Sequence, residues 1–253
     1  MTMINKMSIM KYLRRGLRRY SIEMLKRNSS MWADILEYKK KSKTTGCSWI
    51  DLWTLYKFVR KMKPKEILEF GPGLSTLVIC YALKKNEKEG YDGKITSLEE
   101  NEFYYNMAIE NHLDHLKKYV DFILSPKIEK FYYLFRGVGY EKIPQKNYDF
   151  VFIDGPTLES PTDGEMTFDY DFLEIVKSQE KPVYGIIDYR LTTSFVMQQI
   201  FPPNKVKFDA LRELCFLGPM TKNDFLELKL ENLTQTFNKS FSLFGNTKIR
   251  LRK

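Results

Sequence analysis

The segment from Lys65 to Thr76 constrains the fold of this chain more than any other part of the sequence. It reads KEILEFGPGLST, a short apolar run that breaks at Gly-Pro-Gly and continues as an amphipathic segment from Leu74 to about Lys85. The apolar run has the length and composition of a buried parallel strand. Glycines allow the backbone to approach a ligand closely, and the free N–H groups of a first helical turn face into the crevice. We therefore predict a strand, a glycine turn and a helix that together line a nucleotide-sized pocket.

The acid that ends this strand, Glu69, separates two kinds of nucleotide site. A dinucleotide site requires Gly-x-Gly-x-x-Gly and places an anionic pyrophosphate on the helix N-terminus. Here Thr76 stands at the third glycine position, and the Glu69 carboxylate would repel a pyrophosphate. A ligand with a cationic amino group suits Glu69 better. The pattern Glu69-x-Gly71-x-Gly73 resembles motif I of the class I S-adenosylmethionine-dependent methyltransferases, and a strand-turn-helix without a ligand is the alternative.

A second strand, predicted over 94–100, also ends in acid. Glu99 falls 28 residues after Gly71, near the offset at which a doubly wound fold places the carboxylate that accepts two hydrogen bonds from ribose. Glu99 matches motif II of the same family, with Glu100 as the choice if the register slips by one. A helix-capping acid is the alternative. The resemblance further implies that Ser125, which follows a third strand over 120–124, contacts the adenine edge.

The apolar run over 147–153 is the next strong signal, because it ends in Asp154 and a Gly-Pro turn. It resembles motif IV of the small-molecule O-methyltransferases. The Asn/Asp-Pro-Pro-Tyr/Phe element of amino-methylating relatives is absent from the sequence. The resemblance implies that Asp154 is the catalytic residue of the transfer, acting as a general base toward a hydroxyl acceptor.

A fifth strand, within 181–190, delivers a further carboxylate, Asp188, at its end. In catechol and macrocin O-methyltransferase-like enzymes the equivalent strand ends in Asp-Asn or Asp-Asp, and these residues hold Mg²⁺ together with the motif IV acid. In this chain Tyr189 follows Asp188, and Thr157 stands where the catechol enzymes have a basic lysine. The resemblance therefore names Asp154 and Asp188 as the ligands of a Mg²⁺ ion, if one is bound.

Strands that alternate with helices across 65–200 predict an α/β fold with a parallel sheet covered on both faces. The resemblance implies a doubly wound, mostly parallel, Rossmann-like sheet of seven strands, with the last strand inserted antiparallel. We expect a helix over about 165–180, strands at 205–208 and 214–217, and a closing hairpin within 241–251. The domain that binds S-adenosylmethionine is predicted to span 48–253, after a basic helical extension and linker over 1–47.

The net charge of +9 is concentrated in the N-terminal quarter. Residues 1–64 hold 16 Lys and Arg against four acids, whereas the other 189 residues hold 25 bases against 28 acids. Residues 1–30 are predicted to form one basic amphipathic helix, with an apolar stripe at helical spacing formed by Met10, Leu13, Leu17, Tyr20 and Met24. Three interpretations stay open: packing on the domain or on a second subunit, contact with an anionic membrane surface, and contact with nucleic acid.

The spacing of the cysteines and the hydropathy pattern indicate the cellular compartment of the protein. Three cysteines lie far apart, without the spacing of a zinc site, and this favours a reducing environment. No apolar run is long enough to span a bilayer or to act as a signal peptide. We expect a cytoplasmic protein, with peripheral membrane contact through residues 1–30 as an alternative.

These observations predict an S-adenosylmethionine-dependent methyltransferase that acts on the oxygen of a small molecule or sugar. Two alternatives remain. One is an RNA methyltransferase that uses the basic N-terminus as its phosphate contact. The other is a cofactor-binding module without turnover that serves at a membrane surface or in an assembly.

Overall fold

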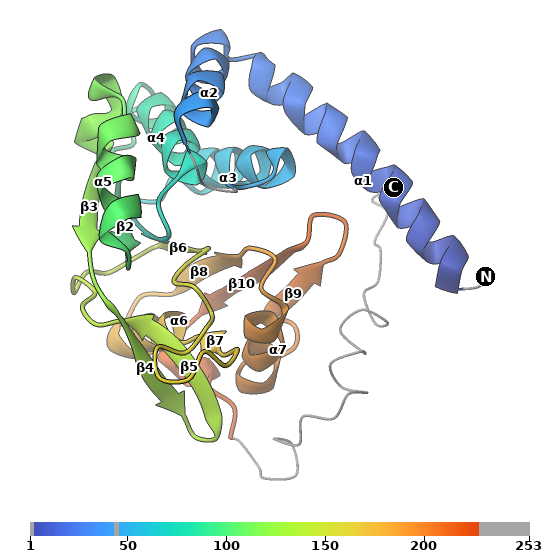
Figure 1. Ribbon diagram of the computed structural model, residues 1–253, viewed down its shortest axis with the longest axis vertical. Coiled ribbons are helices and arrows are strands. Elements are labelled where there is room, and N and C mark those ends of the chain that lie inside the picture. The colour runs from blue at the N-terminus through green and yellow to red at the C-terminus, as the bar shows by residue number, and fades with distance from the viewer. Residues whose placement is uncertain (1–2, 43–45, 228–253) are drawn as a thin grey trace.

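The computed structural model describes residues 3–42 and 46–227. A seven-stranded sheet has the strand order β3-β2-β1-β6-β8-β10-β9 (Figure 1). All its strands are parallel except β10, which pairs antiparallel with both neighbours. The predicted doubly wound sheet with an inserted antiparallel strand is therefore confirmed. Its strands are β1 (Glu66–Phe70), β2 (Lys94–Glu99), β3 (Val120–Leu124), β6 (Phe150–Ile153), β8 (Val183–Ile187), β9 (Val206–Asp209) and β10 (Leu214–Met220).

The two faces of the sheet have separate hydrophobic cores, because successive strand residues point to opposite sides. Ile67 belongs to the core under α3 and α4, whereas its neighbour Leu68 belongs to the core under α6 and α7. Fully burying a side chain of this size stabilises the fold by about 1.5–3 kcal/mol. The helices that cover the sheet are α3 (Trp49–Met62), α4 (Leu74–Glu87), α5 (Glu102–Asn111), α6 (Asp171–Ser178) and α7 (Leu191–Ile200).

The register of the central strands brings their carboxyl ends level with one another. Phe70 of β1 lies opposite Leu98 of β2 and Ile153 of β6, and Ile153 lies opposite Ile187 of β8. The residues that follow these strands therefore meet at one edge of the sheet. In an open α/β sheet this edge is where ligands bind.

A second, three-stranded sheet was not predicted from the sequence. It has the order β4-β5-β7 and lies below the main sheet in Figure 1, with strands β4 (Lys127–Tyr132), β5 (Phe135–Tyr140) and β7 (Phe168–Asp169). Strand β7 occupies the start of the helix predicted over 165–180, so that prediction is wrong there and α6 begins only at Asp171. The reason is tertiary, since Phe168 pairs with Gly137 of β5.

The helix predicted over 1–30 is found as α1 (Met3–Lys26), and a second helix that was not predicted follows it, α2 (Ser29–Lys41). The break comes at Asn28, whose side chain accepts a hydrogen bond from Met31 N–H at 3.2 Å and caps α2. Helix α2 also runs into the predicted linker, since it ends at Lys41. Leu25 of α1 and Ile35 of α2 are buried in the same core as α3 and α4.

The division of the chain at residue 47 stays a prediction. Strands β9 and β10 confirm the two strand-like runs near 205 and 214. The hairpin predicted within 241–251 lies outside the described residues. No helix in the described ranges has the length and apolarity needed to cross a membrane.

Candidate functional site

The structure brings the predicted site residues to the carboxyl edge of the sheet. Glu69 lies next to the C-terminus of β1, Glu99 ends β2, Asp154 follows β6 and Asp188 follows β8. The glycine turn after β1 and the N-terminus of α4 stand between them. The sequence therefore delivers four carboxylates from four adjacent strands to one edge of the sheet.

Glu69 is held by two hydroxyl groups. Its Oε2 accepts hydrogen bonds from Thr76 Oγ1 at 2.6 Å and from Ser97 Oγ at 2.7 Å. Burial raises the pKa of Glu69 to about 7, and the hydroxyl donors only partly offset that rise. The other carboxylate oxygen, Oε1, is buried and has no hydrogen-bond partner among the described residues. An unsatisfied buried carboxylate oxygen is costly in free energy, so a cationic donor from a ligand would stabilise it.

The glycines of motif I have different roles. Gly71 has a φ of +88°, and a Cβ placed there would lie 3.0 Å from the carbonyl oxygen of Asp154. It therefore shapes the turn and allows the β1 and β6 loops to pack closely. Gly73 is the N-cap residue just before α4, and a Cβ placed there would have no atom within 4 Å. The space beside Gly73 is thus open to a ligand at the first turn of the helix.

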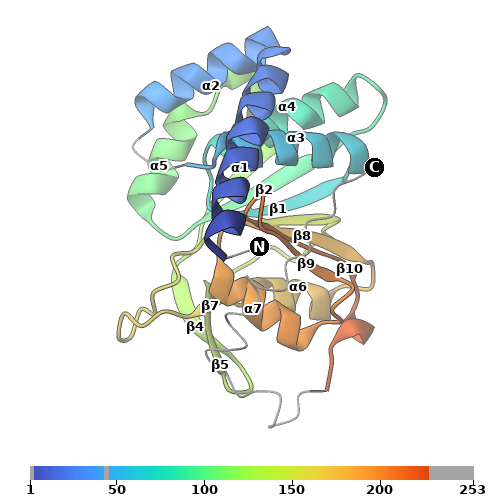
Figure 2. The same ribbon diagram turned by 90° about the vertical axis from the view of Figure 1, so that its right-hand side faces the viewer.

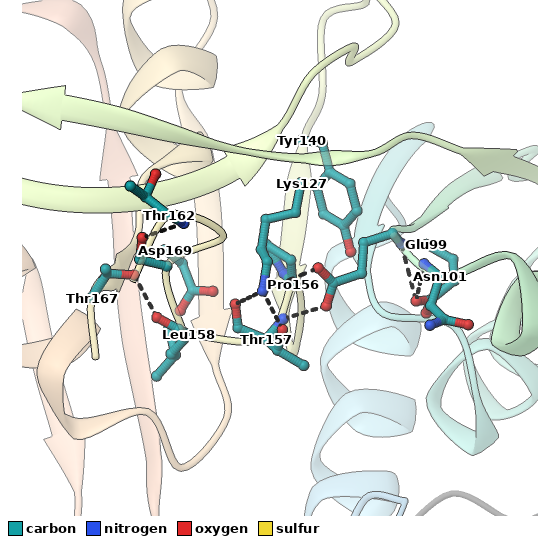
Figure 3. Close-up of polar contacts among 12 residues, drawn as sticks. Glu99, Asn101, Lys127, Tyr140, Pro156, Thr157, Leu158, Thr162, Thr167 and Asp169 are labelled. Carbon is teal, nitrogen blue, oxygen red and sulfur yellow. Dashed lines mark hydrogen bonds and ion pairs between the residues drawn. The ribbon is translucent and has the colours of Figure 1, made fainter. Parts of the chain in front are cut away.

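Glu99 and Glu100 have different partners. Glu99 Oε1 accepts hydrogen bonds from the N–H groups of Glu100 at 3.0 Å and of Asn101 at 2.9 Å (Figure 3). Glu100 instead accepts a hydrogen bond from Thr157 N–H at 2.7 Å and lies 3.4 Å from the ammonium group of Lys127. Glu100 thus ties β2 to the loop after β6. The contact of Glu99 with the ribose hydroxyls stays a prediction.

Ser125 lies at the carboxyl end of β3, as predicted. Its N–H donates to the carbonyl oxygen of Glu99 at 2.9 Å, and its hydroxyl accepts a hydrogen bond from Lys142 N–H at 2.9 Å. The side chain thus connects β3 to the segment after β5. Its contact with the adenine edge stays a prediction.

Asp154 lies between a thiol and a second carboxylate. Cys47 Sγ donates to its Oδ2 at 3.6 Å. Burial raises the pKa of Asp154, and the neighbouring Asp188 raises it further, whereas Arg190 and Cys47 lower it. The side chain is nevertheless 29% exposed, so a substrate can reach it. Asp154 therefore has the accessibility and the raised proton affinity that a general base requires.

Arg190 is a member of this site that the sequence analysis missed. One of its Nη atoms lies 3.9 Å from Asp154 Oδ1, and the other donates to Asp169 Oδ1 at 2.8 Å and to the carbonyl oxygen of Pro156 at 2.6 Å. Asp169 is itself buried, and its Oδ2 accepts a hydrogen bond from Thr193 Oγ1 at 2.6 Å. This network fixes a positive charge beside the candidate base.

Tyr140 was also missed, because no element was predicted at its position. Its hydroxyl donates to the carbonyl oxygen of Leu98 at 3.0 Å, and its ring stacks on Phe70 with centroids 5.3 Å apart. A Cβ at Gly155 would lie 2.8 Å from the Tyr140 hydroxyl oxygen. Figure 3 shows Tyr140 near Glu99. Tyr140 thus contacts the ends of β1 and β2 and the loop after β6.

The residues present do not fit the Mg²⁺ centre of the catechol-type enzymes. In the described part of the chain no group of three His, Cys, Asp or Glu side chains is arranged to hold a metal ion. Tyr189, where those enzymes have Asn or Asp, is mostly exposed, and Arg190 already places a cation beside Asp154. A guanidinium group at this distance opposes a divalent ion. The predicted metal at Asp154 and Asp188 is therefore not carried into the mechanism.

Comparison with solved structures returns several methyltransferases to which this chain is similar at low sequence identity. The O-methyltransferase from Bacillus cereus, solved with S-adenosylhomocysteine, is 16% identical, covers 78% of this chain and 80% of its own, and gives a TM-score of 0.46. A methyltransferase from Podospora anserina, also bound to S-adenosylhomocysteine, is 13% identical over 78% of this chain and 73% of its own, with a TM-score of 0.41.

The O-methyltransferase of tomaymycin synthesis from Streptomyces achromogenes, solved with S-adenosylmethionine, is 15% identical over 73% of this chain and 72% of its own, with a TM-score of 0.40. No protein-family model and no curated protein matches the sequence. None of these three TM-scores reaches 0.5, so the proposed function rests on the residues of the site.

Proposed function

We propose that this chain is an S-adenosylmethionine-dependent methyltransferase that transfers the methyl group to a hydroxyl oxygen of a small molecule or sugar. The observation that carries the proposal is that Glu69 and Glu99 lie at the carboxyl ends of the adjacent strands β1 and β2, near the open turn at Gly73. Both the buried, unpartnered Oε1 of Glu69 and the open space beside Gly73 fit a ligand with an ammonium group. A pyrophosphate would meet two carboxylates there.

Three parts of the chain would hold the cofactor. Glu69 offers an acceptor for the ammonium group of the methionine moiety. The backbone from Gly71 to Gly73 allows the chain to pass close to it, and Glu99 offers a carboxylate for the ribose hydroxyls. Glu69 and Glu99 follow one another along the carboxyl edge of the sheet because β1 and β2 are neighbouring strands.

On the acceptor side the chain must orient a hydroxyl group and remove its proton. The bound cofactor supplies an electrophilic methyl group on a sulfonium. Asp154 lies within reach of a substrate at the end of β6 and accepts the proton of the hydroxyl as the oxygen attacks. Arg190 holds Asp154 and the Pro156 carbonyl in place, so that the reacting groups meet in a near-attack geometry, which can contribute about 7–11 kcal/mol to catalysis.

A pair of variants tests this division of roles. Glu99→Ala should weaken binding of S-adenosylhomocysteine by about ten- to a hundredfold in a calorimetric titration, because it removes charge-assisted hydrogen bonds. Asp154→Asn should leave that affinity within about twofold and abolish methyl transfer to small hydroxylated acceptors. Equal loss of binding in both variants would contradict the proposed roles.

The same assay separates the metal-free mechanism from a metal-dependent one. We expect transfer to persist in excess chelator and to be unchanged by added Mg²⁺. Transfer that stops on chelation and returns with Mg²⁺ would assign Asp154 and Asp188 to a metal instead.

A further inference from the structure

Helix α1 has an outward face that the described part of the protein leaves uncovered. Ser21 and Leu25 are buried against the domain, whereas Tyr12 and Tyr20 are 77% and 52% exposed. The stripe predicted from the sequence placed Tyr20 on the packing side. The structure corrects this, because the buried side of the helix runs through Ser21 and Leu25 and turns Tyr20 outward.

The outward face of α1, taken as Tyr12, Tyr20 and the bases around them, is strongly basic. Its bases are all exposed, and among the described residues none of them forms an ion pair; they are Lys11, Arg15, Arg18 and Arg19. Glu23, the one acid of α1, is paired with Lys26 at 2.8 Å. These four positive charges are therefore uncompensated within the part of the chain that the structure describes.

The helix is fixed to the domain through its other side. Arg14 pairs with Glu213 in the turn between β9 and β10, and Leu25 lies in the core beneath α3 and α4. Figure 1 shows α1 along the right-hand edge of the molecule with α3 on its inner side, and Figure 2 shows the same helix in front when that edge faces the viewer. The outward face is thus presented on a helix held at two points.

We propose that the outward face of α1 binds an anionic lipid surface. Tyrosines are enriched at the headgroup level of membranes, and each Lys or Arg near an anionic surface strengthens association by about fivefold. Two copies of this face would repel each other, which disfavours self-association through it. The remaining 189 residues from position 65 carry a slight excess of acid, so the attraction is confined to this side of the protein.

The test is co-sedimentation of the full chain with lipid vesicles. We expect association with phosphatidylcholine vesicles that contain about one third phosphatidylserine, and none with phosphatidylcholine alone. High salt should release the protein, because it screens exposed charges. Failure to associate with the anionic vesicles at low salt would overturn the proposal.

A matched pair of variants assigns the binding to α1. The triple variant Arg15→Glu, Arg18→Glu, Arg19→Glu should lose at least about a hundredfold in vesicle affinity. The control changes three exposed lysines elsewhere on the domain by the same charge, Lys85→Glu, Lys88→Glu and Lys142→Glu, and should keep most of the binding. Circular dichroism verifies folding, and glutamine at the three arginine positions replaces glutamate if the first variant does not fold.

Two further outcomes would overturn the assignment. Equal loss of vesicle binding in the control and the α1 variant would show an effect of net charge alone. Binding to a short RNA duplex through the same arginines, without binding to vesicles, would assign the outward face of α1 to nucleic acid.

Discussion

Thr76 Oγ1 donates a hydrogen bond to Glu69 Oε2 at 2.6 Å and accepts one from Gly73 N–H at 2.9 Å. A single hydroxyl therefore links Glu69, next to the end of β1, to the first turn of α4. A dinucleotide-binding site has glycine at the position of Thr76, which allows close packing of helix on strand. In this chain the hydroxyl instead orients a carboxylate, and this suits a cationic ligand.

Replacing Thr76 tests this link directly. Thr76→Val keeps the shape of the side chain but leaves Glu69 Oε2 with Ser97 alone, and it removes the acceptor of Gly73 N–H. We expect a loss of about 1–3 kcal/mol in the free energy of unfolding. Thr76→Ser should restore most of it, because serine retains the hydroxyl. Equal stability of the valine and serine variants in urea unfolding would contradict the role of this hydrogen bond.

The two glycines of the turn should respond differently to alanine. Gly71→Ala should destabilise the protein by about 1–3 kcal/mol, because its φ of +88° is strained for alanine and its Cβ would meet Asp154. Gly73→Ala meets no atom within 4 Å and should leave thermal unfolding unchanged. The same change should weaken S-adenosylhomocysteine binding at least tenfold, because the methyl group enters the ligand's space. Unchanged affinity in Gly73→Ala would place the ligand elsewhere.

The raised pKa of Glu69 predicts how cofactor affinity depends on pH. Folding raises the pKa of Glu69 from 4.5 to about 7, so the ligand-free folded protein binds a proton at Glu69 more tightly than the unfolded chain does. Protonation of Glu69 therefore contributes to folding stability fully below about pH 4.5, and this contribution is lost as the pH rises through about 7. An ammonium ligand requires the ionised acid, so S-adenosylhomocysteine affinity should rise roughly eightfold between pH 6 and pH 7.5.

Glu69→Gln provides the control for that pH dependence. The amide cannot ionise, so calorimetric titrations at the two pH values should then give nearly equal affinities. A pH dependence that persists in Glu69→Gln would have to come from another group.

Arg190 should be important for stability as well as for the site. Arg190→Met leaves the buried carboxylate of Asp169 without its cation, and we expect a loss of about 3–5 kcal/mol in the free energy of unfolding. Asp169→Asn combined with Arg190→Met should recover part of this loss, because the buried charge is then removed. Chemical unfolding of the single and double variants measures the coupling. Additive losses would show that the two residues do not act as a pair.

The central architecture could be predicted from the sequence because its signals are local. Strands β1, β6 and β8 are short, largely apolar runs, and each of the strands β1, β2, β6 and β8 ends at an acid or a glycine turn, so the type of element and the edge of the sheet both follow from nearby residues. The first turn of α3 is held by an equally local contact, in which the Ser48 side chain accepts a hydrogen bond from Asp51 N–H at 3.3 Å.

The three-stranded sheet could not be predicted in the same way. The β4–β5 hairpin turns at Tyr133 and Leu134, and neither is a turn-forming residue, although Tyr133 has a φ of +52°. Arg190 was missed for a related reason. Its partner Asp169 lies 21 residues earlier on a two-residue strand, and only tertiary folding brings the two together.

The central claim is that the sheet edge beside Glu69 and Glu99 binds an adenosine derivative with a cationic amino group. Isothermal titration of the full chain with S-adenosylhomocysteine, and separately with NADH, tests it most directly. We predict saturable binding of S-adenosylhomocysteine with one site per chain and no binding of NADH. Uptake of NADH without binding of S-adenosylhomocysteine would contradict the account.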